Sequence, residues 1–381
     1  MLVARAAIDD DERQPGAQRA SVDVSVLVPV RNESAHIESS VAAMCAQRFS
    51  GTVEFLFADG GSEDDTRETL ERLAIHDQRI VVLDNPRRIT PSGLNVCLRH
   101  ARGQYVARMD AHTYYPPDYL ARGVARLRQG GTEWVSGPAV PLPVGRVSRA
   151  VALALQTWIG QGGSRKWRAA TDAEAPEREL DTGVFGGVWL RSTVLRFGGW
   201  DERWPANQDA EMAGRFLATG CRLIMVPAMG ARYVPRDNLA GLARQYWGYG
   251  HYRVQTSNRH PDSMRRSLLV PPLLVLTAAA AAAAPRRVRG PARAGIVLYL
   301  AALAQAAAAT ARREDVRDAA LMPLVLATMH TGHGVGVLRG FMRFGLPWAA
   351  LLRIVGLDRL RSAIRDAPDR DEVFAPSLNA D

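Results

Sequence analysis

Short apolar runs alternate with segments of helical periodicity from residue 24 to about residue 226. Runs rich in β-branched residues, such as Val24–Val30 and Val53–Asp59, are typical of buried strands. Regular alternation of strand and helix predicts a mostly parallel sheet flanked by helices, which is an α/β fold. Further strands are expected at Ile80–Leu83, Tyr105–Asp110, Trp134–Gly137 and Arg222–Val226, and further helices from Thr90, at Gln208–Thr219 and at Leu239–Asn258.

Polar residues at the starts of two helices predict caps. Asn32 is placed to cap a helix that runs to about Gln47. Ser62 is expected to begin the next helix, with Asp65 three residues later in an arrangement similar to a capping box. Residues 160–182 are polar and charged and contain glycines, and they predict a mobile loop.

The pattern changes after residue 262. Segments 268–284 and 294–310 carry no charge and are close to the lower limit for spanning a membrane, and a weaker apolar segment follows at Ala319–Leu338. Arginines flank these segments on every side, so charge gives no clear orientation. The stretch from Leu346 to Arg365 is amphipathic and basic, which suits a helix lying in the membrane interface. The alternative is a soluble helical hairpin packed on the preceding domain.

Charge and cysteine content narrow the classes of protein. The formal net charge is +9, carried almost wholly by arginine, and such a surface suits anionic headgroups or diphosphates. Nucleic-acid binding is disfavoured because no zinc-finger spacing or aromatic RNA-binding pattern is present. The three cysteines are far apart without a CxxC spacing, which indicates buried free thiols in a reducing compartment.

Two acidic motifs follow predicted strands. One begins at Asp59 and the other at Asp110. In parallel sheets, ligands bind beyond the carboxyl ends of the strands, so we expect both motifs to face one ligand.

Four motifs in order carry a resemblance to a known family: PVRNES at Pro29–Ser34, FADGGSEDDT at Phe57–Thr66, MDAH at Met109–His112 and NQDAEM at Asn207–Met212. The chain from about residue 24 to 340 closely resembles family 2 glycosyltransferases with the GT-A fold. MDAH and the later HTGHGVGVLRG resemble the subgroup named for succinoglycan biosynthesis. The resemblance implies an inverting enzyme that moves a sugar from a nucleotide-diphosphate sugar, a UDP-sugar in the first instance, to a hydroxyl of a lipid-linked or polysaccharide acceptor in cell-surface or exopolysaccharide biosynthesis.

The residues present disfavour two other functions. A catalytically inactive nucleotide-sugar-binding module would lack the metal or base residues, which are present here. A dinucleotide-dependent oxidoreductase needs glycines after the first strand, and PVRNES has none.

The resemblance implies a donor site at the first two motifs. Asp59 is expected to accept the N3–H of uracil, and glycine at position 60 lets the backbone approach the ligand. Most relatives carry a second Asp where Gly60 stands. Arginine suits diphosphate binding, although a solvated loop arginine is the plain alternative. The full set of expected donor-binding residues is Pro29, Val30, Arg31, Glu33, Asp59, Gly60, Arg88, Asn95, Met109 and Asp110.

Asp110 and His112 occupy the position of the DxD motif of the family. Residues two apart in an extended chain point the same way, so a divalent cation, Mn²⁺ or Mg²⁺, is expected between them and the donor diphosphate. Imidazole in place of a carboxylate tilts the preference towards Mn²⁺. His112 as an ordinary turn residue is the alternative.

Asp209 stands where the family has its general base, which would remove the proton from the acceptor hydroxyl. Glu211 is the rival base, but its place two residues along a helix points it elsewhere. The expected acceptor-side residues are Gly186, Gly187, Trp200, Asp201, Gln208, Gln245 and Trp247. The segment from Gln245 lacks the Arg-Trp ending of processive synthases, which favours addition of a single sugar.

The expected organisation has four parts: a disordered leader at 1–22, a GT-A catalytic domain at 23–262, membrane-associated apolar helices at 263–340, and an amphipathic helix and tail at 341–381. The leader is acidic and lacks the apolar stretch of a secretory signal. The catalytic domain is therefore expected at the cytoplasmic face of the cell membrane.

Overall fold

The computed structural model describes residues 22–162, 174–183 and 186–357. Two sheets form within them. An eight-stranded sheet has the order β3-β2-β1-β4-β9-β6-β10-β8, and a small sheet has the order β5-β11-β7. The strands are β1 Val24–Val30, β2 Val53–Asp59, β3 Ile80–Asp84, β4 Tyr105–Arg108, β5 Thr113–Tyr114, β6 Trp134–Ser136, β7 Ala139–Pro141, β8 Arg178–Glu179, β9 Gly187–Leu190, β10 Leu223–Met225 and β11 Ala231–Tyr233.

The large sheet is mostly parallel, which confirms the α/β prediction. Strands β3, β2, β1 and β4 run parallel, and β10 pairs parallel with β6. The exceptions are β9, which runs antiparallel between β4 and β6, and β8 at the edge. Strands β1, β2 and β4 are nearly all buried along their length, as expected for strands covered on both faces, whereas β3 at the edge is buried only at Ile80.

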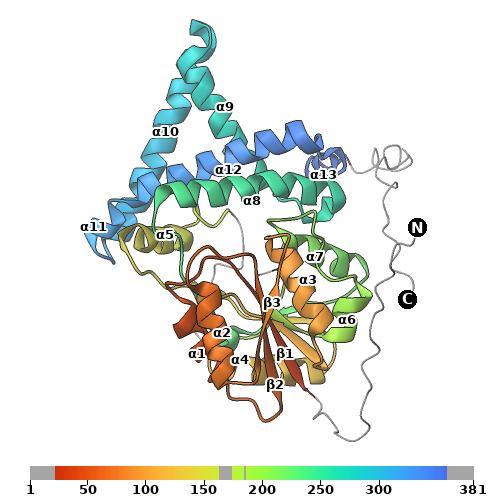
Figure 1. The fold of residues 1–381 in the computed structure, drawn as a ribbon. Coiled ribbons are helices and arrows are strands. Elements are labelled where there is room, and N and C mark those ends of the chain that lie inside the picture. The colour runs from red at the N-terminus through yellow and green to blue at the C-terminus, as the bar shows by residue number, and fades with distance from the viewer. Residues whose placement is uncertain (1–21, 163–173, 184–185, 358–381) are drawn as a thin grey trace, which may run out of the picture.

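Helices cover both faces of the sheet (Figure 1). Apolar residues of α1, α2 and α4 pack on one face, and those of α3, α6 and α7 pack on the other. The helices are α1 Ile37–Cys45, α2 Thr66–His76, α3 Thr90–His100, α4 Tyr119–Arg128, α5 Arg146–Gln156, α6 Arg191–Arg196, α7 Gln208–Ala218, α8 Leu239–Arg259, α9 Val270–Ala283, α10 Arg286–Ala311, α11 Val316–Ala319, α12 Met322–Phe344 and α13 Trp348–Ile354.

Neither predicted N-cap forms. Helix α1 begins at Ile37 and α2 at Thr66, and neither has a side-chain cap. Asn32 lies in the left-handed region with φ 54°, and its side-chain oxygen accepts the backbone N–H of Glu63 at 2.8 Å. In return, the hydroxyl of Ser62 accepts the backbone N–H of Asn32 at 2.9 Å. These polar residues join the loops after β1 and β2 across the sheet edge, a contact that local capping rules do not consider.

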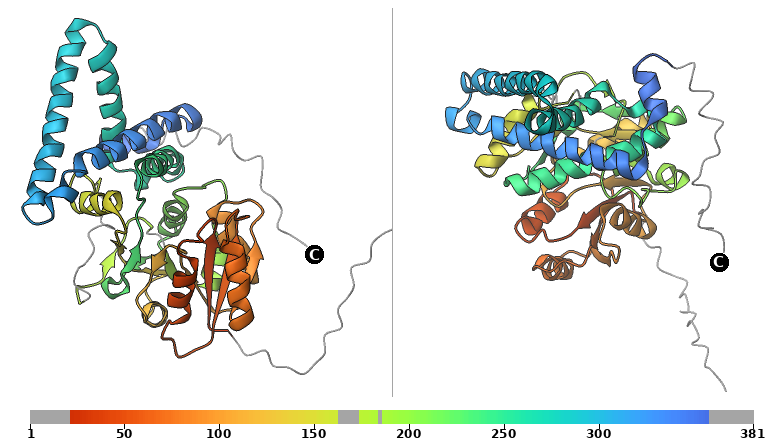
Figure 2. Two further views of the ribbon diagram at one scale, coloured as in Figure 1. Left: turned by 60° about the vertical axis from the view of Figure 1, so that its left-hand side comes forward. Right: turned by 90° about the horizontal axis from the view of Figure 1, so that it is seen from above.

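The C-terminal helices divide into two groups that lie differently (Figures 1 and 2). Helices α8 and α12 lie side by side across the top of the sheet domain, and glycines of α12 allow close packing: a Cβ at Gly336 would lie 2.1 Å from the carbonyl oxygen of Trp247. Helices α9 and α10 form a hairpin that projects away from the domain. The hairpin is therefore much more exposed than α12.

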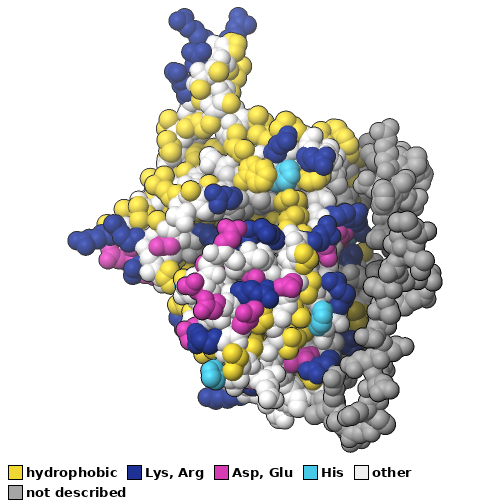
Figure 3. Space-filling model, in the orientation of Figure 1, with side chains coloured by type: hydrophobic (Ala, Val, Ile, Leu, Met, Phe, Trp, Pro, Cys, Tyr) yellow, Lys and Arg dark blue, Asp and Glu magenta, His cyan; other side chains and the backbone are white. Residues whose placement is uncertain are grey.

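Three helical segments are long and apolar enough to cross a membrane: Arg266–Ala283, Arg286–Ala311 and Val316–Phe344. Only 11% and 6% of the best windows of the first two are buried, against 39% for the third, because α12 packs on α8. The hairpin is apolar along its length with arginines at its tip (Figure 3). Of the predicted amphipathic segment, Trp348–Ile354 is helical as α13, and the part after residue 357 lies outside the described residues, as does the expected leader up to residue 21. Of the expected loop at 160–182, residues 163–173 also lie outside them, and Arg178–Glu179 form the short strand β8.

Candidate functional site

The carboxyl ends of the parallel strands bring the predicted motifs to one edge of the sheet. In the register of β1 with β2, Val30 lies beside Asp59. Beyond the end of β4, the backbone N–H of Met109 donates to the carbonyl of Leu27 at 3.1 Å, so the chain that leads into Asp110 continues along β1. The side chains of Val30 and Met109 are buried, so these two residues present only backbone to a ligand.

Arg108 is the centre of the site. Its guanidinium donates from Nε to Oδ1 of Asp110 at 2.9 Å and from Nη2 to Oδ2 of Asp110 at 3.2 Å. From Nη1 it donates to Oδ1 of Asp209 at 2.6 Å. One cation thus holds together two carboxylates, of which Asp110 is 2 residues and Asp209 is 101 residues away in sequence. Asp110 of the expected metal motif and Asp209, the expected base, therefore lie at one place.

Burial sets the electrostatics of this cluster. The side chain of Arg108 is 5% exposed, and those of Asp110 and Asp209 are 13% and 15% exposed. Burial acts to lower the pKa of Arg108, but the charges of Asp110 and Asp209 outweigh it, and the pKa is raised above its ordinary value. The arginine therefore stays charged, and a small part of each carboxylate reaches the surface.

His112 is paired with Glu33 across two loops. Its Nδ1 lies 3.1 Å from Oε1 of Glu33. Burial lowers the pKa of His112, whereas the hydrogen bond and charge of Glu33 raise it, and the net direction is upward. A carboxylate at Nδ1 orients the ring and leaves Nε2 as the nitrogen that can bind a metal, an arrangement common at metal-binding histidines.

A divalent cation fits this donor set as a two-residue site. Asp110 offers carboxylate oxygen and His112 offers imidazole nitrogen. Within the described part of the chain, no group of three or more His, Cys, Asp or Glu side chains comes together to hold a metal. The remaining ligands would therefore have to come from a bound molecule or from water.

Asp59 is buried at the end of β2 and is engaged locally. Its Oδ1 accepts the hydroxyl of Ser62 at 2.6 Å, and Nη1 of Arg67 lies 3.8 Å from its Oδ2. In this structure the carboxylate thus organises the loop before α2. Hydrogen bonding to the base of a nucleotide stays a proposal for this residue.

Glycines and arginines gather beside Asp59. A Cβ at Gly60 would lie 3.4 Å from the side chain of Arg31, and one at Gly61 would lie 3.3 Å from Nε of Arg88. Gly61 has φ +67° and Arg88 has φ 58°, so both turns adopt left-handed backbone. The structure therefore places the guanidinium of Arg88 and the aliphatic stem of Arg31 against a glycine turn, and a guanidinium beside such a turn suits a diphosphate.

The rival base, Glu211, is directed away from the cluster. Its side chain is 0% exposed and forms a salt bridge with Arg215 at 2.9 Å. Arg259 and His260 each lie 3.5 Å from its Oε1. Asp209 and Glu211 are neighbours in sequence, but α7 points one towards Arg108 and the other into a buried ion-pair network.

The expected acceptor-side residues separate into two groups. Gly187 pairs with Arg108 between β9 and β4, Gly186 carries φ +74°, and Gln208 is buried at the first position of α7. Trp200 does not reach the surface: it is 1% exposed and packs edge-on against Trp189 at 5.8 Å. The ring of Trp200 is thus part of the core, and its place on the acceptor side stays a prediction.

Asn95 and Asp201 form hydrogen bonds within the loop before α7. The side chain of Asn95 donates to the carbonyl of Trp200 at 2.8 Å and accepts its N–H at 2.9 Å. Burial raises the pKa of Asp201, but hydrogen bonds from Arg203 lower it more, so the net direction is downward. These contacts hold the segment that leads to Asp209.

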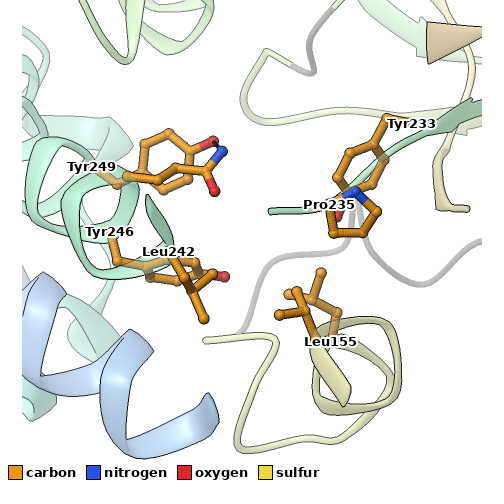
Figure 4. A pocket seen from close by; sticks show the side chains of 8 residues that line it. Leu155, Tyr233, Pro235, Leu242, Tyr246 and Tyr249 are labelled. Atoms are coloured by element: carbon orange, nitrogen blue, oxygen red, sulfur yellow. Dashed lines mark hydrogen bonds between the residues drawn. The ribbon is translucent and has the colours of Figure 1, made fainter. Parts of the chain in front are cut away.

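Two further acceptor-side residues lie on α8. Trp247 is 38% exposed and stacks on His251 at 4.8 Å. Gln245 donates to the hydroxyl of Tyr249 at 3.0 Å and lines a hollow together with Tyr246 (Figure 4).

Sequence reasoning missed Arg108 and Tyr115. The hydroxyl of Tyr115 accepts the backbone N–H of Asp110 at 2.9 Å, and so fixes the loop that carries the aspartate. Arg108 is a charged residue within a predicted buried strand, between Val106 and Met109. A buried charge requires a partner, so its position in the strand could have indicated a role in the site.

Comparisons with known proteins agree with this geometry. The model of the family described as "Glycosyl transferase family 2" matches residues 25–170. The succinoglycan biosynthesis protein ExoA of Rhizobium meliloti (strain 1021) is 32% identical over 240 residues, which are 62% of this chain and 70% of that protein. The dolichol-phosphate mannosyltransferase of Saccharomyces cerevisiae (strain ATCC 204508 / S288c) is 30% identical over 107 residues, 27% of this chain and 40% of that protein.

Among solved structures, a mannosyltransferase from Pyrobaculum calidifontis in complex with GDP-Man and Mn²⁺ covers 84% of this chain and 90% of its own, with 22% identity and a TM-score of 0.49. The strand-end cluster, the family model that covers β1 to α5, and the extent of the match to ExoA lead to one assignment: the chain belongs to glycosyl transferase family 2 and is a glycosyltransferase.

Proposed function

We propose that the enzyme inverts the anomeric centre as it moves a sugar from a nucleotide-diphosphate sugar to a hydroxyl of a lipid-linked or polysaccharide acceptor, in exopolysaccharide or other cell-surface biosynthesis. The observation that carries the proposal is the bridge of Arg108 between Asp110 and Asp209. One guanidinium contacts both Asp110, a proposed metal ligand, and Asp209, the proposed base, which supports a common site for donor and acceptor.

In this proposal, Asp209 removes the proton from the acceptor hydroxyl while the oxygen attacks the anomeric carbon. The bond from that carbon to the phosphate oxygen breaks, and its electron pair leaves with the nucleoside diphosphate. Arg31 and Arg88 at the glycine turn hold the diphosphate. A divalent cation, when bound by Asp110 and His112, neutralises charge on the departing group.

The donor is proposed to be a UDP-sugar, with Asp59 at the uracil. The test is a donor screen that measures release of nucleoside diphosphate with Mn²⁺ or Mg²⁺ and a membrane lipid extract as acceptor. Release that depends on both the donor and the extract supports the proposal, whereas donor binding without release would favour an inactive binding module.

Glu33→Gln is expected to weaken Mn²⁺ binding by about 10–100-fold, because Glu33 orients the metal-binding ring of His112. Binding is measured by electron paramagnetic resonance of Mn²⁺ in the presence of UDP, which does not require turnover. Glu63→Gln, in the neighbouring loop and 73% exposed, is the matched control and should bind Mn²⁺ as the parent does. Equal affinity of the two variants contradicts the role of Glu33.

The imidazole ligand also predicts higher activity with Mn²⁺ than with Mg²⁺. Activity with Mg²⁺ that equals or exceeds activity with Mn²⁺, each at its saturating concentration, would contradict His112 as a ligand.

We also propose that the enzyme works at the cytoplasmic face of the cell membrane, anchored by the α9–α10 hairpin. The uncharged stretches 267–285 and 294–311 are each roughly 27 Å long as helix, close to the roughly 30 Å hydrocarbon core. Arginines 286, 287, 289 and 293 at the tip and 312 and 313 at the base bracket them. Helix α12, packed on α8, is proposed to lie along the surface with Trp348 nearby.

Leu298→Asp is expected to release part of the enzyme from membranes. Leu298 is 71% exposed in the middle of α10, and a charge at the centre of a spanning helix costs about 2.5–3.5 kcal/mol. Ile75→Asp, at a position 79% exposed on α2 of the sheet domain, should leave the enzyme in the membrane pellet. Extraction at high pH measures both, and identical behaviour of the two variants would contradict insertion of the hairpin.

A further inference from the structure

The loop that leads into the proposed base is tied to helix α8. The side-chain amide of Asn207 donates to the carbonyl oxygen of Tyr249 at 2.9 Å. Earlier in the loop, Nε1 of the buried Trp204 donates to the hydroxyl of Thr256, which is also buried, at 3.0 Å. Tyr249 and Thr256 both belong to α8, so this helix holds the loop at two separate points.

Asn207 has an unusual conformation for a residue that directly precedes a helix. An asparagine in this position normally has extended backbone, and its side chain caps the first turn of the helix. Asn207 instead has φ 62°, in the left-handed region, and its amide donates across to α8 in place of capping α7. Left-handed backbone outside glycine is unfavourable, and it persists where the surrounding structure holds it, commonly at functional sites.

A second segment supports the backbone of the base. A Cβ at Gly183 would lie 2.3 Å from the carbonyl oxygen of Asp209, so the two backbones are in close contact. Two residues before Gly183, Asp181 forms a salt bridge with Arg265 at 2.6 Å, and Arg265 follows α8 in the chain. This second support of Asp209 is therefore also connected to the C-terminal part of the molecule.

The side chain of Asp209 is held from the other direction. Nη1 of Arg108, on strand β4 of the large sheet, donates to its Oδ1 at 2.6 Å. The sheet thus fixes the carboxylate, whereas α8 fixes the backbone that carries it. A displacement of α8 relative to the sheet would move the base away from the reacting atoms, and a misplacement of about 1 Å can cost about 10²-fold in rate.

Helix α8 forms one packed unit with α12. A Cβ at Gly250 of α8 would lie 2.2 Å from the carbonyl oxygen of His333, and one at Gly340 of α12 would lie 2.8 Å from the carbonyl oxygen of His251. Contacts of this kind leave room for a hydrogen atom only, so neither helix can shift without the other. Because α12 is proposed to lie along the membrane surface, the support of the base comes from that side.

We infer that Asn207 is a positioning residue for sugar transfer, which fixes Asp209 relative to α8, and that the α8–α12 pair is therefore part of the catalytic machinery as well as of the membrane attachment. The inference rests on the proposed role of Asp209 as base and deepens it. Loss of the Asn207 amide should impair the transfer step and spare donor binding, because Asp59 and Asp110 follow strands of the sheet and do not depend on α8.

Asn207→Gly tests this in the full-length enzyme in detergent. Glycine adopts left-handed backbone readily, so the turn is kept and only the amide is lost. We expect kcat for release of nucleoside diphosphate, with a membrane lipid extract as acceptor, to fall about 10–100-fold. The affinity for UDP with Mn²⁺, measured by calorimetry, should stay within about twofold of the parental value, because a residue that acts on the base leaves donor binding intact.

Asn238→Gly is the matched control. Asn238 caps α8, and its side chain accepts the backbone N–H of Gly241 at 2.6 Å, away from the loop of the base. The same substitution there should leave kcat unchanged. If Asn207→Gly does not fold, the second hydrogen bond supplies the test: Thr256→Val removes the hydroxyl that accepts Nε1 of Trp204 and should lower kcat, whereas Thr256→Ser keeps the hydroxyl and should restore it.

A double-variant cycle separates positioning from general damage. A residue that acts through Asp209 has nothing left to position in Asp209→Asn, so adding Asn207→Gly there should change the rate by less than about twofold. The same rate factor in both backgrounds, a parental kcat in Asn207→Gly, or a loss of UDP affinity that accounts for the lower rate would each overturn the inference. Parental transfer by Asp209→Asn would instead show that the proposed base is wrong and remove both proposals, whereas a slow Asp209→Asn beside a normal Asn207→Gly overturns the inference alone.

Discussion

Asp209→Asn is expected to lower the rate of sugar transfer by about 10²–10⁴-fold while donor binding persists, which is the typical contribution of a general base. Asparagine has the same shape, and its side-chain oxygen can still accept Nη1 of Arg108, so the cluster should keep its geometry. The measurement is nucleoside diphosphate release at saturating donor and acceptor, together with donor affinity by calorimetry. Retention of more than about a tenth of the parental rate would rule out Asp209 as the base.

Glu211→Gln is the control for this variant. Glu211 lies two residues away on the same helix, but its buried salt bridge with Arg215 makes it a structural residue. Breaking a buried pair destabilises by roughly 3–5 kcal/mol, so the folded Glu211→Gln enzyme should keep its rate and unfold at lower urea concentration. The reverse pattern, a normal midpoint with a lost rate, would make Glu211 the base.

The second large effect is expected at Arg108. Arg108→Met removes the cation from between two mostly buried carboxylates, which leaves Asp110 and Asp209 uncompensated. We expect a loss of roughly 3–5 kcal/mol in the free energy of unfolding. We also expect transfer to fall, because the two carboxylates would repel each other and move from the positions proposed for metal and acceptor.

Two further variants separate charge from geometry. Arg108→Lys keeps the positive charge but lacks the planar set of guanidinium N–H donors. Compared with Arg108→Met, it should recover part of the stability and a smaller part of the transfer rate. In the double variant Arg108→Met with Asp209→Asn, removal of the second charge should return part of the lost stability, with a coupling of about 0.5–3 kcal/mol for groups in contact. Additive urea-unfolding energies, or an Arg108→Met enzyme as stable and active as its parent, would contradict the bridging role.

Much of the fold was accessible from the order of residues. The strands Val24–Val30 and Val53–Asp59 and the helix from Leu239 were predicted nearly to the residue, because each is a long segment of clear periodicity. Strand β9 was not predicted: Gly187–Leu190 is four residues long, begins at the second of two glycines and runs antiparallel. A short strand of that kind is specified by its neighbours β4 and β6, which no local pattern contains.

Part of the candidate site could also be predicted from the sequence, and part could not. That acidic motifs follow β2 and β4 could be read from the chain, and the general behaviour of parallel sheets then placed them at one edge. The family resemblance indicated Asp209 as the base, and the direction of residues on a helix pointed Glu211 elsewhere. The contact partner of each side chain could not be predicted in this way. Asn32 was expected to cap its own helix, yet it bonds to Glu63 on the next loop, and Trp200 was expected at an acceptor, yet it lies in the core.

Only the tertiary structure decided that Arg108 joins Asp110 to Asp209, that Glu33 contacts His112, and that α12 packs on α8 while the more apolar α10 is mostly exposed. The physical reason is the range of the interactions. Periodicity, caps and turns act over a few residues and are written in consecutive positions, whereas a buried charge or an apolar face is satisfied by a partner that strand order and helix packing bring from 80 to 100 residues away.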